Sequence, residues 1–495
     1  MPKLSTILLL LLLSLPGWAQ KRFDWTPALR SAYHKTVNLR FQEAERELEA
    51  IRKSDPDNLL ILHVENYLDF FRVYINEEEA EFVKLEKNKD ARIKRIQQEG
   101  DPASPYYLYL QADIRLQWAL ARLKFEQYST AFFETNRAFK LLSRNDAKFP
   151  DFMPNKKDLG ILKAMVGTIP SNYKWAVNWL SSMDGTIEEG RSELEAVVAH
   201  ARKNDFIYEQ EAYIYYTYLL LHLDNDSESA WKVINTANLK PAESPMACFI
   251  MANVAMRTDR GDEAIAFLEK RPTGNQFHPF YYLDYMLGLA KLQRLDPDAG
   301  KYLLRFTENF KGRNFIKDAY QKLAWHSLLH GDRAGYTSYM ELCKSRGYKV
   351  VGSDRSADAE ARLGEVPAVD LLKARVLFDG GRFQRAYNLM KDKKASDYLA
   401  EKNQLEFTYR MGRITHKLKK YDEALSFYQK TIDAGKNSPY YYACRAALEK
   451  GHVLETTGKQ AEAKEAYKLC LTLSPDDHKT GLHQQAKAGL RRLKS

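Results

Sequence analysis

The chain is poor in the features that mark a catalytic or metal-binding protein. It has four cysteines in 495 residues, and they lie too far apart to form the CxxC spacing of metal sites. It also has no phosphate-cradling glycine-rich loop, no GxSxG motif and no HExxH motif. Two histidines one helical turn apart, His326 and His330, lack a third ligand at a fixed spacing. We therefore expect no catalytic residues, no metal and no cofactor.

The cysteines allow two interpretations. Cys248, Cys343, Cys444 and Cys470 fit four small buried core residues, because free cysteine is among the most buried residue types. Cys444 and Cys470 could also lie within one helical hairpin and form a disulfide, if the protein is exported. The sequence leaves this pairing open.

No uninterrupted apolar run long enough to span a bilayer follows the first twenty residues. Before that point, Met1–Lys3 supply a positive start and Ile7–Leu15 form an apolar run interrupted by Ser14. The run is shorter than the ~20 residues that a bilayer-spanning helix needs. Small residues follow, so the pattern predicts a signal peptide at residues 1–19 that is cleaved after Ala19. No cysteine lies near this cut, which argues against a lipoprotein, and we expect a periplasmic or secreted protein.

The charge balance is moderately basic. Lysine and arginine number 75 against 65 acidic residues, a formal net charge of +10. A basic exported protein can meet acidic proteins, anionic lipid headgroups or polyanionic sugars, whereas nucleic acid is not expected in that compartment. A solvated surface with no ligand explains the same charge.

Sustained strand-like alternation is also missing, and residues 347–352 form the one β-like segment. Helical repeats are present instead, most clearly at residues 407–436. There Gly412 and Ala424 are small, and Tyr421 and Tyr428 are large. Small residues let two helices approach closely, and large ones fill the space beside them. The pattern predicts an antiparallel helical hairpin.

Neighbouring segments repeat the pattern. Gly451, Ala463 and Tyr467 follow in the next unit, and residues 482–493 have the pattern of a capping helix. The preceding unit is marked by Ala374, Gly381, Phe383 and Ala386. We therefore predict an all-α superhelix with a signal peptide at 1–19, a divergent helical array at 20–350, a junction at 351–366 and a regular trio with its cap at 367–495.

Proline motifs support the helical reading. Ser104-Pro105, Ser244-Pro245, His278-Pro279 and Ser438-Pro439 each precede aromatic or apolar residues. Serine can accept a hydrogen bond from a free backbone amide, and proline suits the first helical position. Each motif predicts the start of a helix, and the many tyrosines are then explained as packing residues.

The last three units resemble the tetratricopeptide repeat, whose hairpins are about 34 residues long. A fainter resemblance covers much of the rest, carried by Gly160, the apolar run through Pro170 to Leu180, Gly185, Gly190, Leu194 and residues 244–250 and 261–265. These features are similar to the eukaryotic tetratricopeptide family that contains a mitochondrial outer-membrane protein tied to inclusion-body clearance. The resemblance implies a helical array and no particular activity.

The repeat resemblance also implies a binding surface, because the first helix of each hairpin lines the inner side of such arrays. The inward positions of the trio are occupied by Arg375, Tyr409, Arg413, His416, Lys417, Arg445 and His452. Arginine can bind a carboxylate with two parallel hydrogen bonds, so this basic column suits an acidic peptide or a C-terminal carboxylate. The asparagines of the chaperone-binding carboxylate clamp are missing, which argues against a chaperone tail.

Two functional hypotheses follow. The first is an exported scaffold or adaptor that binds a protein or acidic peptide in an envelope assembly, with peripheral membrane association compatible and the oligomeric state open. The second is a ligand-binding protein or enzyme with a pocket in the divergent half, around Trp175, Trp179 and Tyr213–Tyr218. A stable partner protein would favour the scaffold hypothesis. A closed pocket with convergent polar groups would favour the ligand-binding or enzyme hypothesis.

Overall fold

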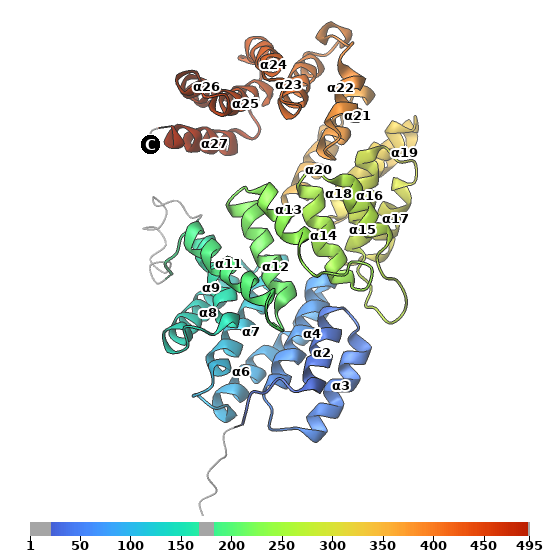
Figure 1. Ribbon diagram of the computed structural model, residues 1–495. Coiled ribbons are helices and arrows are strands. Elements are labelled where there is room, and N and C mark those ends of the chain that lie inside the picture. Colours follow the sequence, from blue (N-terminus) through green and yellow to red (C-terminus); the bar gives the residue numbers. More distant parts are fainter. Residues whose placement is uncertain (1–20, 168–182, 494–495) are drawn as a thin grey trace, which may run out of the picture. The chain divides into compact units, whose positions relative to one another are not determined.

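The computed structural model describes residues 21–167 and 183–493 (Figure 1). Helices make up 74% of the structure, and the described residues contain no strand. The predicted all-α fold is therefore confirmed. The predicted signal peptide, Trp175 and Trp179 lie outside the described residues. Among the helices described, none is long and apolar enough to cross a membrane.

The chain divides into two compact units. The N-terminal unit comprises Met1–Val254, Phe267–Tyr282 and Phe310–Asn314, and the C-terminal unit comprises Ala255–Ala266, Leu283–Asn309 and Phe315–Ser495. Two helices, α14 (Pro245–Arg257) and α15 (Gly261–Glu269), are divided between the two units, and Tyr282, the first residue of α16 (Tyr282–Arg294), also belongs to the N-terminal unit. The junction predicted at 351–366 falls inside the C-terminal unit.

The other helices of the N-terminal unit are α2 (Pro27–Val37), α3 (Phe41–Ser54), α4 (Leu60–Asn76), α5 (Glu79–Leu85), α6 (Lys87–Glu99), α7 (Pro105–Lys124), α8 (Tyr128–Lys148), α9 (Met153–Gly167), α11 (Ile187–Ala201), α12 (Glu209–Tyr218), the π-helical η2 (Leu219–Leu223) and α13 (Ser227–Asn235). Those of the C-terminal unit are α16 (Tyr282–Arg294), α17 (Ala299–Asn309), α18 (Ile316–Leu329), α19 (Arg333–Ser345), α20 (Gly352–Leu363), α21 (Val369–Asp379), α22 (Phe383–Met390), the short η3 (Ala395–Asp397), α23 (Glu401–Lys417), α24 (Tyr421–Gly435), α25 (Tyr442–Thr456), α26 (Gln460–Thr472) and α27 (Lys479–Arg492). Consecutive helices pack as hairpins, among them α7 with α8, α18 with α19, α23 with α24 and α25 with α26.

Serine–proline motifs start helices as predicted. Ser104 caps α7, where its hydroxyl accepts a hydrogen bond from the amide of Tyr106 at 3.3 Å. The hydroxyl of Ser244 accepts one from the amide of Ala247 at 3.2 Å, at the start of α14. These bonds satisfy amides that have no partner within the helix. The other two motifs stand a few residues before α16 and α25.

Close packing at glycine explains the hairpins of the trio. A Cβ atom added at Gly412 would lie 2.6 Å from the ring of Tyr428, which is fully buried on the facing helix α24. Gly451 faces the ring of Tyr467 on α26 in the same way. The pairing of a small residue with a large aromatic, predicted from the sequence, is confirmed at both hairpins.

The predicted junction contains a helix, α20, and residues 347–352 form no strand. Asp354 accepts hydrogen bonds from the backbone amides of Phe315 at 2.7 Å and Asp318 at 3.0 Å. It thereby satisfies free amides at the start of α18. Lys317 adds an ion pair to Asp358 at 3.0 Å. Asp354 and Asp358, both inside the predicted junction, thus dock α20 on α18.

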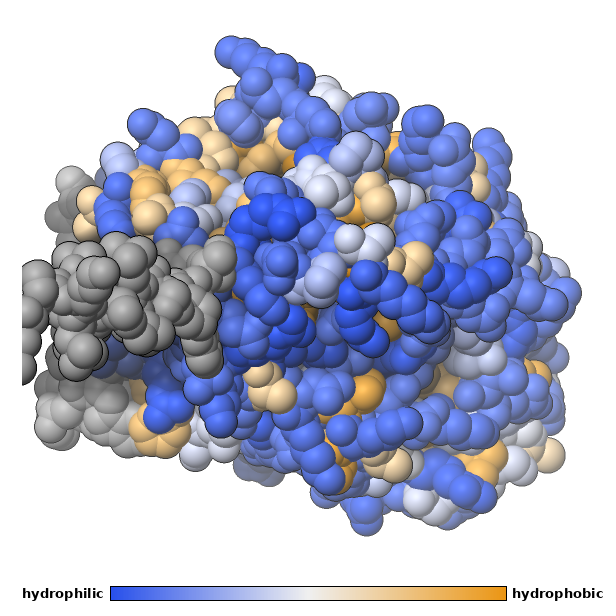
Figure 2. All heavy atoms as spheres, turned by 90° about the horizontal axis from the view of Figure 1, so that it is seen from below, coloured by the Kyte–Doolittle hydropathy of each residue, from blue (hydrophilic) through white to orange (hydrophobic). Residues whose placement is uncertain are grey.

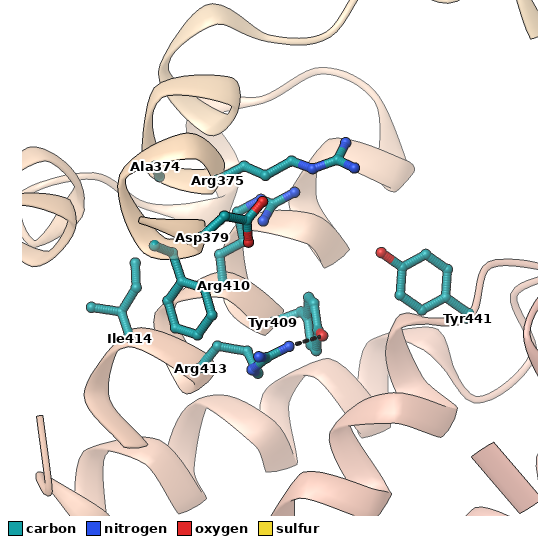
Figure 3. A pocket seen from close by; sticks show the side chains of 9 residues that line it. Ala374, Arg375, Asp379, Tyr409, Arg410, Arg413, Ile414 and Tyr441 are labelled. Atoms are coloured by element: carbon teal, nitrogen blue, oxygen red, sulfur yellow. Dashed lines mark hydrogen bonds between the residues drawn. The ribbon is translucent and has the colours of Figure 1, made fainter. Parts of the chain in front are cut away.

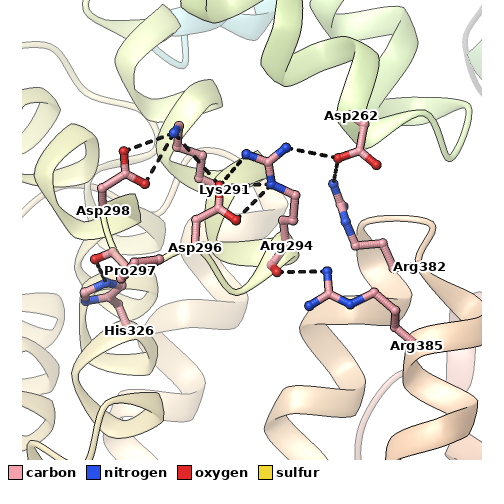
Figure 4. A network of polar contacts seen from close by, with 9 residues as sticks. All are labelled: Asp262, Lys291, Arg294, Asp296, Pro297, Asp298, His326, Arg382 and Arg385. Carbon is pink, nitrogen blue, oxygen red and sulfur yellow. Dashed lines mark hydrogen bonds and ion pairs between the residues drawn. The ribbon is translucent and has the colours of Figure 1, made fainter.

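Polar contacts also connect the turns between hairpins in the C-terminal unit (Figure 4). Asp262, at the start of α15, accepts hydrogen bonds from Arg294 at 3.2 Å and Arg382 at 2.8 Å. Arg385 of α22 donates to the backbone oxygen of Arg294 at 3.2 Å. These contacts bring the end of α16 and the start of α22 to one carboxylate. Exposed ion pairs contribute little to stability singly, typically about 0–1 kcal/mol each.

The core of the molecule is rich in aromatic side chains. Fully buried tyrosines are Tyr33, Tyr67, Tyr109, Tyr208, Tyr213, Tyr428 and Tyr467. The prediction that tyrosines act as packing residues is confirmed for this set. The surface in Figure 2 is mainly hydrophilic, and its hydrophobic residues form small separate patches. Patches of this size are normal on proteins and mark no interface by themselves.

Candidate functional site

A cavity of about 170 Å³ lies between consecutive first helices of the trio (Figure 3). It is lined by Ala374, Arg375, Phe378, Asp379, Tyr409, Arg410, Arg413, Ile414 and Tyr441. The first four belong to α21, the next four to α23, and Tyr441 immediately precedes α25. We call this cavity the three-arginine pocket, after Arg375, Arg410 and Arg413. Figure 3 shows their side chains extending to the same side of α21 and α23, towards Tyr441.

Arg375 is held by an aromatic ring and one carboxylate. Its guanidinium carbon lies 4.4 Å from the ring centre of Trp325, and its Nη1 lies 3.4 Å from Glu360. Burial alone would lower the pKa of Arg375, but the charge of Glu360 outweighs it and the pKa is raised. The group stays charged, and 36% of its side chain remains exposed.

Arg410 is paired within its own helix. Its Nε donates to Glu406 at 2.7 Å, and its Nη2 also contacts that carboxylate. Tyr442 donates to the other oxygen of Glu406 at 3.2 Å. Burial would lower the pKa of Arg410, and the charge of Glu406 reverses this, so the pKa is raised. The pairing fixes the guanidinium beside the pocket.

Arg413 lies between two aromatic rings. Its guanidinium carbon is 4.6 Å from the ring centre of Phe378, and its Nη1 donates to the hydroxyl of Tyr409 at 2.8 Å. Its Nε is 3.9 Å from Glu449. Planar guanidinium groups stack on aromatic faces and keep their edge donors available. The stack orients Arg413 towards the pocket.

The carboxylate of Glu449 is shared by three basic side chains, one of which is Arg413 of the pocket. The residue is 7% exposed and accepts from Nε of Arg445 at 2.9 Å, and it lies 3.4 Å from Nδ1 of His452. Burial would raise the pKa of Glu449, but the hydrogen bond from His452 and the charges of Arg413 and Arg445 hold it well below its usual value. The predicted basic column is therefore partly neutralised by a carboxylate that its pattern did not include.

Four of the seven predicted residues do not line the pocket: Arg445 and His452 contact Glu449, and His416 and Lys417 have other partners. Nδ1 of His416 is 3.3 Å from the hydroxyl of Tyr428, and burial lowers the pKa of His416. Lys417, at the end of α23, donates to Asp259 at 2.9 Å. The structure thus brings Arg375, Tyr409 and Arg413 together in one pocket and gives His416 and Lys417 partners elsewhere.

The sequence reasoning missed Asp379, Arg410 and Tyr441. Helical spacing could have indicated two of them. Asp379 is four residues after Arg375, and Arg410 is three before Arg413, so each lies on the same helix face as a predicted residue. Tyr441 lines the pocket from the turn before α25, and hairpin spacing alone does not indicate this.

The pocket retains unused hydrogen-bond donors. A guanidinium has five N–H donors. Among the described residues, Arg375 donates one hydrogen bond, Arg410 uses two of its nitrogens and Arg413 donates one to Tyr409. Asp379 is exposed at the edge of the pocket, beside Arg410 in Figure 3. The arrangement can bind a carboxylate or another small anionic group.

The second hypothesis concerned the divergent half, of which part is described. Tyr213 is buried in the core, and Tyr216 donates to Glu195 at 2.6 Å. An open pocket of about 460 Å³ lies beside it, lined by Arg191, Glu195, Arg202, Tyr216, Ser229, Lys232, Val233 and Thr236. These residues belong to α11, α12, α13 and the positions that follow α11 and α13, and the predicted Trp175 and Trp179 lie outside the described residues.

A cluster of ionisable side chains is fully buried in the N-terminal unit, and the sequence did not indicate it. Lys157 and Asp158, on α9, have no exposed surface, and Nζ of Lys157 contacts Asp158 at 2.5 Å and Glu211 at 2.9 Å. Tyr33 and Tyr67 donate to the other oxygen of Glu211 at 2.7 and 2.6 Å. We call this set, with Asp113 and His63, the buried acid cluster.

Burial dominates the protonation of this cluster. It raises the pKa of Asp158 to about 6, although the charge of Lys157 acts in the opposite direction. Burial and the neighbouring Asp158 raise the pKa of Asp113 well above its ordinary value, and burial lowers the pKa of His63 to about 3. The histidine is therefore neutral, and the two aspartates retain protons to a higher pH than exposed aspartates. Such a cluster specifies the core, but its members are not accessible to a ligand.

The described residues include no group of three or more side chains suited to hold a metal ion. The histidine pair is bound to backbone instead. His326 Nε2 lies 3.0 Å from the oxygen of Pro297, and His330 Nδ1 lies 2.8 Å from the oxygen of His326 (Figure 4 shows the first).

A family model described as tetratricopeptide repeat matches residues 445–477. The matched segment covers most of α25 and all of α26, and includes Arg445, Glu449 and His452. The chain therefore carries a tetratricopeptide repeat at this position. A search of curated proteins gives no significant match.

Solved structures that are similar to this chain include three at 12–14% sequence identity. The TPR domain of P58(IPK) is 14% identical, with 87% of this chain and 97% of that chain covered and a TM-score of 0.22. Naa15/Naa10 bound to HypK-THB is 12% identical, with 94% and 65% covered and a TM-score of 0.24. The APC/C hetero-tetramer Cut9–Hcn1 is 13% identical, with 94% and 95% covered and a TM-score of 0.25. Likenesses at these TM-scores carry no inference about function, and the resemblance to the mitochondrial family is not shown.

Proposed function

We propose that this protein is an exported scaffold that binds a partner protein, and that the three-arginine pocket holds a carboxylate of that partner. The single observation that carries the proposal is the convergence of Arg375, Arg410 and Arg413 in one pocket, with N–H donors that no described side chain uses. The tetratricopeptide repeat beside it supports a binding role, because stacked helical hairpins form extended binding surfaces.

The chemistry of the pocket favours a carboxylate. Guanidinium groups bind carboxylates with paired, charge-assisted hydrogen bonds, which are about twice as strong as neutral ones. Stacking on Trp325 and Phe378 holds two of these groups in place before the ligand arrives. Side chains that are already oriented lose less entropy on binding, so the affinity rises.

The size of the pocket favours a peptide side chain or chain terminus. Its volume of about 170 Å³ is smaller than the ~300–1,000 Å³ typical of small-molecule sites. One carboxylate group fits this volume, and the rest of its chain would lie outside it. An acidic segment of a protein meets that condition better than a free metabolite does.

Asp379 adds a selectivity element. Its exposed carboxylate stands at the edge of the pocket, so it repels a second negative charge placed there. The ligand that fits best carries its carboxylate on the guanidinium side and a hydrogen-bond donor near Asp379. A uniformly acidic tract fits less well.

The cellular setting is the second part of the proposal. The positive start, short apolar run and small residues up to Ala19 support export. An exported binding scaffold would act in an envelope assembly, and peripheral association with a membrane-bound partner is compatible with this role.

Affinity capture from envelope extract tests the proposal. The chain is compared with the variant Arg375→Glu/Arg413→Glu and with the control Lys430→Glu/Lys468→Glu, which makes the same charge change at exposed positions of α24 and α26. A partner should be captured by the wild type and the control and reduced at least tenfold by the pocket variant. Equal capture by all three would contradict the pocket, and an uncleaved N-terminus in cells would contradict export.

A second candidate function is ligand binding, or catalysis, in the N-terminal unit. The open pocket of about 460 Å³ beside Tyr216 is the observation that favours it, since this volume suits a small molecule. Arg191 and Glu195 supply polar groups of both signs there. Thermal-shift screening of small anions and sugars against the wild type and Arg191→Ala would reveal such binding, and no shift for any compound would remove this candidate.

A further inference from the structure

Two cysteines face each other inside the last hairpin. Cys444 of α25 and Cys470 of α26 are 1% and 0% exposed, and their sulfur atoms lie 3.6 Å apart. In the described part of the chain, neither of the other two cysteines has a second cysteine beside it. Cys248 donates to the oxygen of Phe267, and Cys343 donates to the oxygen of Lys317. The chain thus contains one dithiol and two isolated thiols, which serve as internal controls.

We propose that Cys444 and Cys470 form a thiol–disulfide site, which closes to a disulfide when it meets the disulfide of a small thiol or of a thiol–disulfide exchange protein. A disulfide bond is about 2.05 Å long, so the sulfurs must approach by roughly 1.5 Å. Both residues lie on helices that already face each other, and side-chain rotation supplies movement of this size. This inference is independent of the proposed function.

The surroundings indicate which sulfur reacts first. Cys444 lines a cavity of about 350 Å³ between the turns 435–440 and 472–475, and Cys470 is not among its lining residues. The hydrogen bond that the two thiols share lowers the pKa of Cys444 and raises that of Cys470. The thiolate is the attacking species in thiol–disulfide exchange. Access and ionisation therefore both select Cys444.

The reaction proceeds in two exchanges. The thiolate of Cys444 attacks one sulfur of the oxidant disulfide, forms a mixed disulfide and releases one thiolate. Cys470 then loses its proton and attacks the sulfur of Cys444, which closes the internal bond and releases the second thiolate. Two electrons pass to the oxidant, and the two released thiolates take up the two protons lost by the cysteines.

The closed bond would join α25 to α26. Helix α25 carries Arg445 and Glu449 and follows directly after Tyr441 of the three-arginine pocket. The bond closes a loop of 26 residues in sequence, which restricts the unfolded chain. We expect it to protect the last hairpin against unfolding and to leave the other hairpins unchanged.

The test uses the purified full chain with oxidised glutathione as the oxidant. Free thiols are counted by maleimide labelling and mass spectrometry after denaturation, and linked peptides are identified after digestion. The folded wild type should lose two thiols, yield a Cys444–Cys470 peptide and retain no glutathione. The variant Cys248→Ser/Cys343→Ser should behave in the same way.

Single variants resolve the order of attack. Cys470→Ser should accumulate glutathione on Cys444, whereas Cys444→Ser should leave Cys470 unmodified for at least ten times longer. Circular dichroism checks that each variant is folded. Retention of four thiols by the folded wild type, under conditions in which the urea-unfolded chain is oxidised, would overturn the proposal. So would glutathione found equally on Cys248, Cys343 and Cys444.

Discussion

Replacing Asp158 with asparagine should change how the stability of the N-terminal unit depends on pH. Asp158 has no exposed surface, and burial raises its pKa from 3.8 to about 6. A carboxyl group with a raised pKa stabilises the fold below its unfolded pKa, and this contribution is lost as the pH rises through the folded pKa. For Asp158 the loss falls between pH 3.8 and about 6.

The magnitude follows from the shift. A difference of about two pKa units corresponds to about 3 kcal/mol. Lys157 of α9, Glu211 of α12 and Asp113 of α7 act on the carboxyl group of Asp158, and Nζ of Lys157 contacts it directly. Asparagine also removes the negative charge that raises the pKa of Asp113, so part of that group's pH dependence disappears as well. Between pH 4 and pH 8 we expect the variant to lose less stability than the wild type by about 2–3 kcal/mol, because the unfolded carboxyl is already partly ionised at pH 4.

The assay is urea denaturation at pH 4 and pH 8, followed by pulsed hydrogen exchange and mass spectrometry. This method reports peptides of α7, α9 and α12 separately from those of the C-terminal unit. Asp90→Asn, at an exposed aspartate of α6, serves as the control and should follow the wild type. Equal pH dependence in the wild type and Asp158→Asn would refute the reasoning.

Three further outcomes are expected. Glu449→Gln removes the buried carboxylate that three basic side chains share, and should lower the free energy of unfolding of the C-terminal unit by about 3 kcal/mol in urea denaturation; an unchanged midpoint would contradict this. Gly451→Ala places a methyl group against the ring of Tyr467 and should cost about 1–3 kcal/mol in the same assay, whereas Gly458→Ala, with no atom near its Cβ, should be affected only through its left-handed backbone. If the protein is exported, chains alkylated inside intact cells should contain the bond between Cys444 and Cys470, and fully reduced cysteines there would count against an oxidising compartment.

The hairpins could be predicted from the sequence because their contacts are local. Gly412 with Tyr428, and Gly451 with Tyr467, are each 16 residues apart on the two helices of one hairpin, and a repeated small–large pattern indicates such neighbours directly. The sequence prediction that groups Arg375 with Arg413 uses the same register, and both residues line the three-arginine pocket. These parts of the fold depend on periodicity, which a single sequence contains.

The remaining contacts of the fold and the site depend on which hairpins pack against each other, and a single sequence does not show this. Lys157 and Asp158 resemble a solvated charged pair, yet helices distant in the sequence enclose them. Glu449 was not expected behind the basic column, because its burial depends on the neighbouring hairpin that supplies Arg413. The sequence pattern placed Lys417 in the basic column. In the structure its ammonium group donates to Asp259, which is far away in the sequence.

The most direct test of the central claim is photo-crosslinking from inside the three-arginine pocket. A photoreactive phenylalanine replaces Tyr441 in cells, with the same residue at exposed Tyr128 as the control. The account predicts a crosslinked partner at position 441 that disappears with Arg375→Glu/Arg413→Glu, and a crosslinked peptide that contains an acidic side chain or a chain terminus. A crosslink that survives both substitutions, or that involves a segment without a carboxylate, would contradict the account.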